Sequence, residues 1–242
     1  MLELLLTAVA VAAGAVASVV GFAIGSLLTP VLALRVEMEI AVAAVSIPHL
    51  VGTAVRFWRL RGHVDRRVLW SFGIASAIGG LTGALLHSWA SSPWLSGLFG
   101  GLLLFVAVSE FTGLSGRMRF SGPFALIAGA LSGLLGGLVG NQGGIRSAAL
   151  MDARMSKETF VATATAIGLI VDAARMPVYL IVERAALVQI WPLILLATAG
   201  VVTGTVLGTR LLARIPESMF RRVVAVILAV LGVYMMIRAS GG

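Results

Sequence analysis

The sequence predicts an all-α, polytopic integral membrane protein with two inverted repeats, each an interrupted or re-entrant helical segment followed by three transmembrane helices. Three observations predict this class: an apolar composition, an internal duplication and an uneven distribution of basic residues. Of the 242 residues, 59% are hydrophobic and 12% are charged, and the mean hydropathy is +1.04. A soluble domain of this length could not bury so much apolar surface. The chain is therefore expected to lie in a bilayer.

Hydropathy divides the chain into eight apolar blocks. Most have the roughly twenty residues that a spanning helix needs. The first and fifth are longer, and glycine, proline or polar residues interrupt both of them. The blocks cover residues 3–34, 39–60, 67–88, 93–114, 121–150, 158–181, 187–209 and 217–239.

The two halves of the chain align with each other. At a shift of 115 residues, the first block matches the fifth through Gly14/Gly129, Gly21/Gly136 and Gly25/Gly140. The following blocks match at shifts of 119 and 121, through Ala43/Ala162, Ser46/Thr165, Ala54/Ala173, Arg56/Arg175, Gly79/Gly200, Thr82/Thr203 and Gly83/Gly204. We interpret the chain as a tandem duplication with halves at residues 1–115 and 120–242.

The basic residues indicate how the halves are oriented. Outside Arg56, Arg146 and Arg175, fifteen Lys and Arg residues lie in the links and the tail. They divide eight against seven if every block crosses, but twelve against three if the fifth block enters and leaves on one side. The second division follows the positive-inside rule and makes the halves face opposite ways, as in many secondary transporters. Charge does not decide whether the first block spans, but the duplication favours a re-entrant one.

The net charge of +8 does not indicate a nucleic-acid partner, because most basic residues lie in short links between apolar blocks. The absence of cysteine excludes disulfides, thiolate metal sites and cysteine nucleophiles. No metal-ligand spacing and no pairing of a nucleophile with a base occurs in the sequence. We therefore expect no cofactor, no metal and no enzymatic activity. The expected partners are the lipid bilayer and a small anion, and a homo-oligomer is compatible with the sequence.

Residues 140–147, with the sequence GNQGGIRS, form the strongest candidate for an anion site. Non-helical backbone inside a membrane requires protein or water partners, and glycines allow the tight turn. A helix that begins near Gly144 would turn its free amide groups toward an anion. Asn141 and Gln142 add amide donors, and Arg146 adds a guanidinium suited to a carboxylate, sulfite or sulfonate. The alternative is that the glycines only allow helices to pack closely.

Two polar stripes give the second candidate. Ser46, His49, Thr53 and Arg56 share one helical face, and the duplicated helix repeats their spacing with Thr165, Gly168, Asp172 and Arg175. The stripes would face each other across a central cavity. The alternatives are that Arg56 snorkels to the interface, that Asp172 only neutralises Arg175, and that His49 is a packing residue. If they are functional, Asp172 and His49 are candidates for proton coupling.

These residues resemble the sulfite exporter TauE/SafE family, also called the toluene sulfonate uptake permeases. The resemblance covers essentially the whole chain: a glycine-rich interrupted segment opens each half, an alanine-rich helix follows, and the third segment contains glycines. The family often has a Gly-x-Gly-Gly-Gly stretch in the first half, where this chain keeps Gly21 and Gly25. In the second half the triple glycine is replaced by Asn141-Gln142-Gly143-Gly144. The resemblance implies secondary transport of small sulfur-containing or carboxylate anions across the bacterial inner membrane.

The sequence thus predicts an anion transporter that works by alternating access. A passive anion channel and a membrane-embedded enzyme or assembly factor are the alternatives. The predicted substrate-binding residues are Asn141, Gln142, Gly143, Gly144, Arg146, Ser147, Arg175, Arg56, Gly21, Gly25, Ser26, Ser46 and Thr165, with Asp172 and His49 for coupling.

Overall fold

The computed structural model describes residues 1–114, 123–141, 143, 146, 150, 155–212 and 217–241. Throughout these residues the regular secondary structure is helical, as predicted. Seven helices in the described part are long and apolar enough to cross a membrane. The protein is therefore a multi-pass membrane protein.

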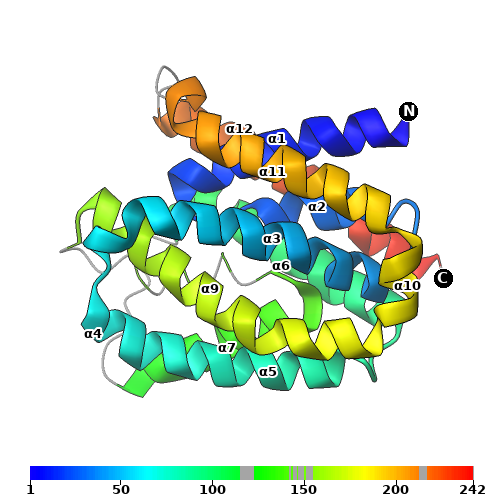
Figure 1. The fold of residues 1–242 in the computed structure, drawn as a ribbon, viewed down its shortest axis with the longest axis horizontal. Coiled ribbons are helices and arrows are strands. Elements are labelled where there is room, and N and C mark those ends of the chain that lie inside the picture. The colour runs from blue at the N-terminus through cyan, green and yellow to red at the C-terminus, as the bar shows by residue number, and fades with distance from the viewer. Residues whose placement is uncertain are drawn as a thin grey trace.

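The first half contains four helical segments long enough to cross a membrane and one short helix, α2, between the first two of them (Figure 1). In chain order the elements are α1 (Leu2–Val20), α2 (Ile24–Leu32), α3 (Met38–Leu60), η1 (Arg61–His63), α4 (Arg66–Val68), the π-helical η2 (Leu69–Gly73), α5 (Ile74–His87) and α6 (Ser92–Thr112). The described elements of the second half are α7 (Pro123–Val139), α9 (Lys157–Val182), α10 (Arg184–Gln189), α11 (Trp191–Leu212) and α12 (Glu217–Ser240).

Both long apolar blocks are interrupted, as the sequence predicts. After α1, Gly21 has a left-handed φ of 85° and Ala23 a φ of 131°, which is unusual for a residue with a side chain. After α7, Gly140 has a φ of 74°. The two glycines are 119 residues apart (140 − 21), the same shift that aligns α3 with α9. The alignment of these two blocks at a shift of 115 is therefore displaced by one helical turn.

Side-chain caps define where two of the elements near the α3–α5 link begin. Asp65 accepts hydrogen bonds from the backbone N–H groups of Arg67 at 2.9 Å and Val68 at 3.1 Å. Ser156 accepts one from the backbone N–H of Thr159 at 3.2 Å, at the start of α9. Such caps satisfy N–H groups that the first helical turn leaves unpaired. They fix the start of α9, which carries one of the polar stripes.

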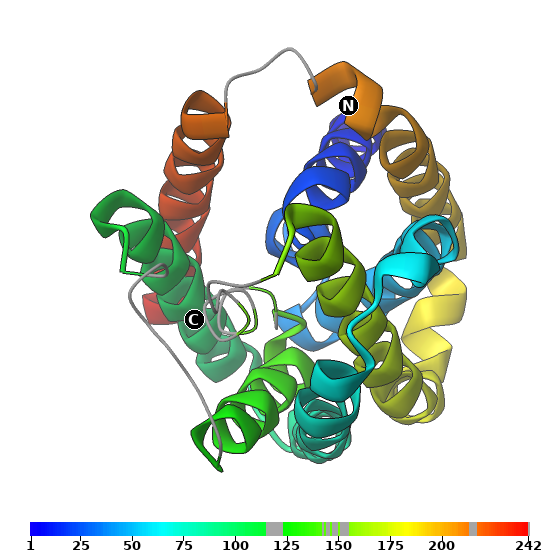
Figure 2. The ribbon, with the colours of Figure 1, turned by 90° about the vertical axis from the view of Figure 1, so that its left-hand side faces the viewer.

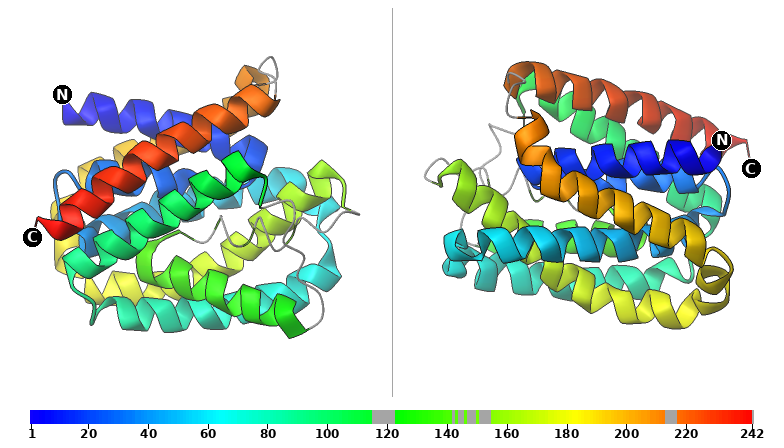
Figure 3. Two further views of the ribbon diagram at one scale, coloured as in Figure 1. Left: turned by 180° about the vertical axis from the view of Figure 1, so that it is seen from behind. Right: turned by 45° about the horizontal axis from the view of Figure 1, so that its top comes forward.

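The two broken segments approach the centre from opposite ends of the bundle. Both termini lie at one end, together with the α2–α3 link (Figures 1 and 3), where Arg238 donates a hydrogen bond to the Val36 carbonyl at 3.2 Å. The α3–α5 link lies at the other end, beside the start of α9, where the Asp65 N–H donates to Thr163 Oγ1 at 2.9 Å. α1 runs inward from the first end and α2 returns to it, whereas α7 starts at the second end (Figure 1).

Helices of the two halves pack in reciprocal pairs. α1 packs against α11, α7 against α5, α3 against α9, and α6 against α12 at one side of the molecule (Figure 2). Glycines bring the backbones of the first two pairs together. A Cβ atom on Gly14 would meet the Val201 carbonyl, and one on Gly137 would meet the Gly80 carbonyl. Small residues are the usual means of close helix packing in membranes. Each broken helix is thus held by a helix of the other half.

Candidate functional site

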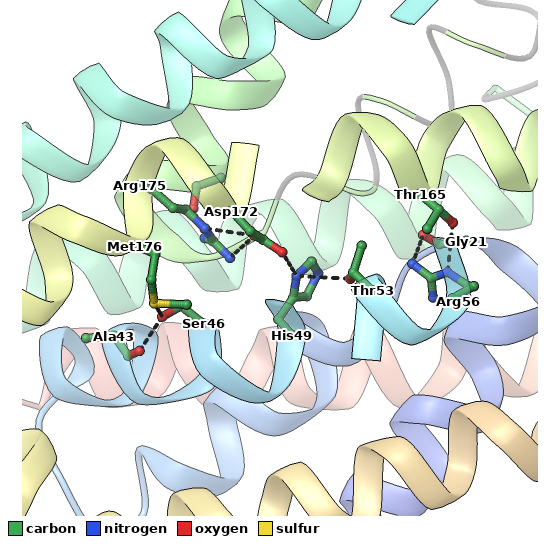
Figure 4. Close-up of polar contacts among 11 residues, drawn as sticks. Gly21, Ala43, Ser46, His49, Thr53, Arg56, Thr165, Asp172, Arg175 and Met176 are labelled. Carbon is green, nitrogen blue, oxygen red and sulfur yellow. Dashed lines mark hydrogen bonds and ion pairs between the residues drawn. The ribbon is translucent and has the colours of Figure 1, made fainter. Parts of the chain in front are cut away.

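The two polar stripes face each other where α3 packs against α9 (Figure 4). Hydrophobic residues around them bury each stripe residue almost completely. None of the polar members exceeds 7% exposure, and they are Ser46, His49, Thr53 and Arg56 on α3 and Thr165, Asp172 and Arg175 on α9. The structure therefore brings together the residues that the helical spacing selects.

Asp172 is the centre of a charged network between the halves (Figure 4). Its Oδ2 lies 2.6 Å from His49 Nδ1, across the α3–α9 contact. Its Oδ1 accepts a hydrogen bond from Arg175 Nε at 3.0 Å and lies 2.9 Å from Arg175 Nη2. Thr53 Oγ1 lies 3.5 Å from the same His49 nitrogen, at the edge of hydrogen-bond distance. The network is continuous from α3 to α9 and contains the two residues predicted for coupling.

Arg175 also holds the broken end of α7. Its Nη1 donates to the Gly136 carbonyl, and the Tyr179 hydroxyl donates to the Gly137 carbonyl. His87, at the end of α5, places Nδ1 at 2.7 Å from the Leu138 carbonyl. Three successive carbonyls of the last turn of α7 therefore have side-chain partners. Carbonyls at a helix C-terminus lack intrahelical partners and carry a partial negative charge, so a nearby cation stabilises them.

Arg56 has the equivalent role at the end of α1. Its Nη1 donates to the Ala17 carbonyl at 2.7 Å and its Nη2 to the Gly21 carbonyl at 3.3 Å. Its Nε donates to Thr165 Oγ1 at 2.8 Å, on the facing helix. Ala17 is 119 residues before Gly136, so the two arginines cap corresponding carbonyls. Arg56 does not snorkel, because its guanidinium turns into the protein and is 3% exposed.

Arg146 differs from both capping arginines. Its side chain is 1% exposed, and its Nε and Nη1 atoms have no hydrogen-bond partner among the described residues. Its guanidinium lies against Gly168 of α9. The buried Nδ2 atom of Asn141 likewise has no partner within the described part of the chain. Buried, unpaired N–H groups are costly and call for an acceptor.

Other predicted site residues lie at or near the two breaks. A Cβ atom on Gly25 would meet the Gly140 carbonyl, so α2 touches the second break directly. A Cβ atom on Gly143 would overlap the Phe22 ring. Ser26 is buried, and Ser46 donates to the Ala43 carbonyl of its own helix. The predicted residues Gln142, Gly144 and Ser147 lie outside the described residues.

The charges of this region do not balance among its described groups. Three guanidinium groups, from Arg56, Arg146 and Arg175, lie near one carboxylate, that of Asp172, and their charges act on one another. His49 adds a further titratable group. Electrostatic interactions are strong in a buried, poorly polarisable setting. The described groups of this region therefore carry a net positive charge.

Tyr179 and His87 are site residues that sequence analysis did not select. The signal for Tyr179 was available, because it lies four residues after Arg175 and so on the same helical face. No such signal exists for His87, which is far from the stripes in the sequence and meets Tyr179 ring to ring at 5.2 Å. Its part in the site depends on the packing of α5 against α7.

The fold and the site define a class of protein. Broken helices that meet buried charged groups in a multi-pass helical protein are typical of secondary transporters. The model of the sulfite exporter TauE/SafE family matches residues 6–235, which is nearly the whole chain. The chain belongs to this family, and the resemblance predicted from its sequence is confirmed. Comparison with curated proteins and with solved structures returned no match.

Proposed function

We propose that this protein is a secondary transporter that carries a small anion across the bacterial inner membrane by alternating access. The substrate is sulfite, an organosulfonate or a related sulfur-containing or carboxylate anion, in keeping with the family description. One observation carries the proposal: the Nε and Nη1 atoms of the buried Arg146 side chain have no partner among the described residues, whose charged groups here are mostly positive.

Arg146 is the best candidate for direct contact with the anion. Arg56 and Arg175 have partners on all three guanidinium nitrogens, mostly at the breaks, whereas Arg146 keeps two N–H-bearing nitrogens free of described partners. An anionic oxygen would satisfy these donors with charge-assisted hydrogen bonds, which are stronger than neutral ones. Arg56 and Arg175 act on the anion through their charge and by holding the breaks. The Asn141 amide, whose Nδ2 has no partner among the described residues, is a candidate second donor.

Replacing Arg146 by alanine tests this assignment. Purified protein in liposomes is expected to move radiolabelled sulfite, and Arg146→Ala to reduce the flux about 10- to 100-fold, since hydrogen bonds to a charged group contribute about 1.5 to 3 kcal/mol. Arg35→Ala is the control, because it removes an exposed arginine. Thermal-shift assays with sulfite, sulfonates, thiosulfate, acetate and chloride would identify the anion. Undiminished flux through folded Arg146→Ala protein would exclude the proposed role.

Two features support an inverted repeat. The glycines at the breaks and the arginines that cap them recur at one shift of 119 residues. The broken segments also start from opposite ends of the bundle (Figure 1). In alternating access, one half rocks against the other about a central site. The α3–α9 contact is where such motion would alter the site.

Cysteine labelling tests the inversion, and the chain has no native cysteine to interfere. Leu114→Cys and Ser156→Cys, on exposed residues before and after the second broken segment, are expected to react with an impermeant maleimide from the same side. Leu34→Cys, exposed at the α2–α3 link, is expected to react from the opposite side. Labelling of positions 114 and 156 from opposite sides would mean that the segment spans the membrane and would overturn the inverted topology.

We further propose that Asp172 and His49 couple transport to protons. Their 2.6 Å contact joins α3 to α9, so a change in protonation would alter the bond between the halves. Arg175 on α9, Arg56 on α3 and Arg146 are the charged groups around them. A histidine is the side chain best suited to exchange a proton near neutral pH.

His49→Gln separates proton coupling from hydrogen bonding. The glutamine amide can donate to Asp172 but does not titrate, so the contact between α3 and α9 is retained. In liposomes with an imposed pH gradient, wild-type protein is expected to accumulate the anion above equilibrium, whereas His49→Gln only equilibrates it. Counterflow exchange without a gradient measures whether the variant still carries the anion. Accumulation by His49→Gln at the wild-type level would contradict the coupling role.

A further inference from the structure

The two repeats differ in sequence at one pair of residues in the α3–α9 contact. At the shift of 119 residues, His49 corresponds to Gly168 and Thr53 corresponds to Asp172. The contact between His49 and Asp172 therefore has a counterpart between Gly168 and Thr53. The structure brings this second pair together as well, since a Cβ atom on Gly168 would lie 3.6 Å from Thr53 Cγ2. One contact carries an imidazole and a carboxylate, and its counterpart carries neither.

The guanidinium of Arg146 occupies the space that Gly168 leaves. A Cβ atom on Gly168 would lie 3.1 Å from Arg146 Nη1 and 3.7 Å from Arg146 Cζ. A larger side chain in place of this glycine would thus collide with the guanidinium. The absence of a side chain at residue 168 is what allows Arg146 to approach α9 between the two stripes. Nη1, one of the two nitrogens that lack described partners, therefore lies next to Gly168.

Thr53 of α3 lies beside Gly168 and carries a hydroxyl. Its Cγ2 lies near Gly168, and its Oγ1 lies 3.5 Å from His49 Nδ1, as Figure 4 shows. A threonine hydroxyl can donate to an anion while its oxygen accepts from another group. At the corresponding position of α9, Asp172 would repel an anion.

We infer that Gly168 is a specificity-determining residue, which limits the size of the anion bound at Arg146, and that Thr53 supplies a hydroxyl donor to that anion. The inference rests on the proposed function, because it concerns the same site. In this arrangement the anion lies on the Gly168 and Thr53 side of the α3–α9 contact. The His49 and Asp172 side remains a bridge between the halves.

The test is the affinity of purified variants for two anions of different size, sulfite and toluenesulfonate, measured by isothermal titration. Gly168→Ala is expected to weaken toluenesulfonate binding at least about 10-fold and sulfite binding less, because the added methyl group displaces the Arg146 guanidinium into space that the larger anion needs. The second variant, Thr53→Val, keeps the shape of the side chain but removes the hydroxyl. Thr53→Val is expected to weaken the binding of both anions by a similar factor, about 5-fold.

A matched control adds a methyl group on η2, which packs against α9. A Cβ atom on Gly73 would meet Ile167 at 3.5 Å and Ile170 at 4.0 Å, which are ordinary contacts, so Gly73→Ala is expected to bind both anions like wild-type protein. The double variant Gly168→Ala with Thr53→Ser, which removes the neighbouring Cγ2 but keeps the hydroxyl, is expected to recover part of the lost toluenesulfonate affinity.

The outcomes separate this inference from the proposed function. If wild-type protein binds neither anion, or if Arg146→Ala binds both as well as wild type, the proposed site itself fails. If Arg146→Ala loses binding while folded Gly168→Ala keeps both affinities and their ratio, only the role of Gly168 fails. If Gly168→Ala does not fold, Thr53→Val decides the location, and unchanged affinities in that variant would overturn it.

Discussion

Asp172→Ala is expected to cause the largest loss of stability of any single substitution at this site. The carboxylate lies within hydrogen-bond distance of His49 and forms an ion pair with the buried Arg175. Its removal takes away the negative charge that acts on all three guanidinium groups. Breaking a buried ion pair on one side costs about 3 to 5 kcal/mol, because the remaining charge is desolvated and unpaired. For a chain of this size that corresponds to a melting temperature roughly 10 °C lower.

Thermal unfolding of the detergent-solubilised protein measures this effect. Glu37→Ala is the control, since it removes an exposed carboxylate that forms no side-chain cap at the start of α3. The melting temperature of Asp172→Asn is expected to lie between those of Asp172→Ala and Glu37→Ala. Its amide oxygen can still accept a hydrogen bond from Arg175 but carries no charge. A melting temperature for Asp172→Ala within 1 or 2 °C of wild type, roughly the range of neutral surface changes, would show that the network contributes little.

Arg175→Ala is expected to have the second largest effect and to exceed Arg56→Ala. Arg175 pairs with a buried carboxylate and also caps the Gly136 carbonyl, so its removal leaves Asp172 with His49 alone. We expect a cost of about 3 to 5 kcal/mol. Arg56 donates to neutral acceptors, the Ala17 and Gly21 carbonyls and a threonine hydroxyl. Its loss is expected to cost about 1.5 to 3 kcal/mol.

The comparison between two corresponding positions makes this prediction specific. When both are measured in one detergent, the melting temperature of Arg175→Ala should be lower than that of Arg56→Ala. The double variant Asp172→Ala with Arg175→Ala should lose less stability than the sum of the losses in the two single variants, because each single substitution already breaks the same network. Equal losses for the two arginines, or strict additivity in the double variant, would contradict the assigned contacts.

Several parts of the fold follow from local sequence patterns. The breaks at Gly21 and Gly140 lie inside the two apolar blocks that were too long for one span and carried glycines. The spacing of the polar residues on α3 and α9 selected a buried set, because the helical period alone decides which residues share a face. The shift between the first and fifth blocks was wrong by one turn, since glycines recur every few residues there and several alignments fit them.

Less of the candidate site could be predicted from the sequence. Both stripe arginines are predicted to contact the anion, and the structure adds that their hydrogen bonds cap the broken helices. Nothing in the spacing distinguishes a guanidinium that meets a carbonyl from one that meets a ligand, because this depends on the register of α7 against α9. Gly168 was selected as a stripe residue, but its proximity to the Arg146 guanidinium depends on tertiary packing that the spacing does not encode.

The sequence by itself determined that the chain lies in a membrane, that two segments are broken and that polar faces are buried, because hydropathy, glycine content and helical period act over a few turns of one chain segment. The tertiary structure decided which partner each buried charge has, and so which arginine keeps donors without a partner in the described part of the chain. Hydrogen bonds require atoms within about 3 Å, and here those atoms come from helices more than a hundred residues apart, such as His49 and Asp172.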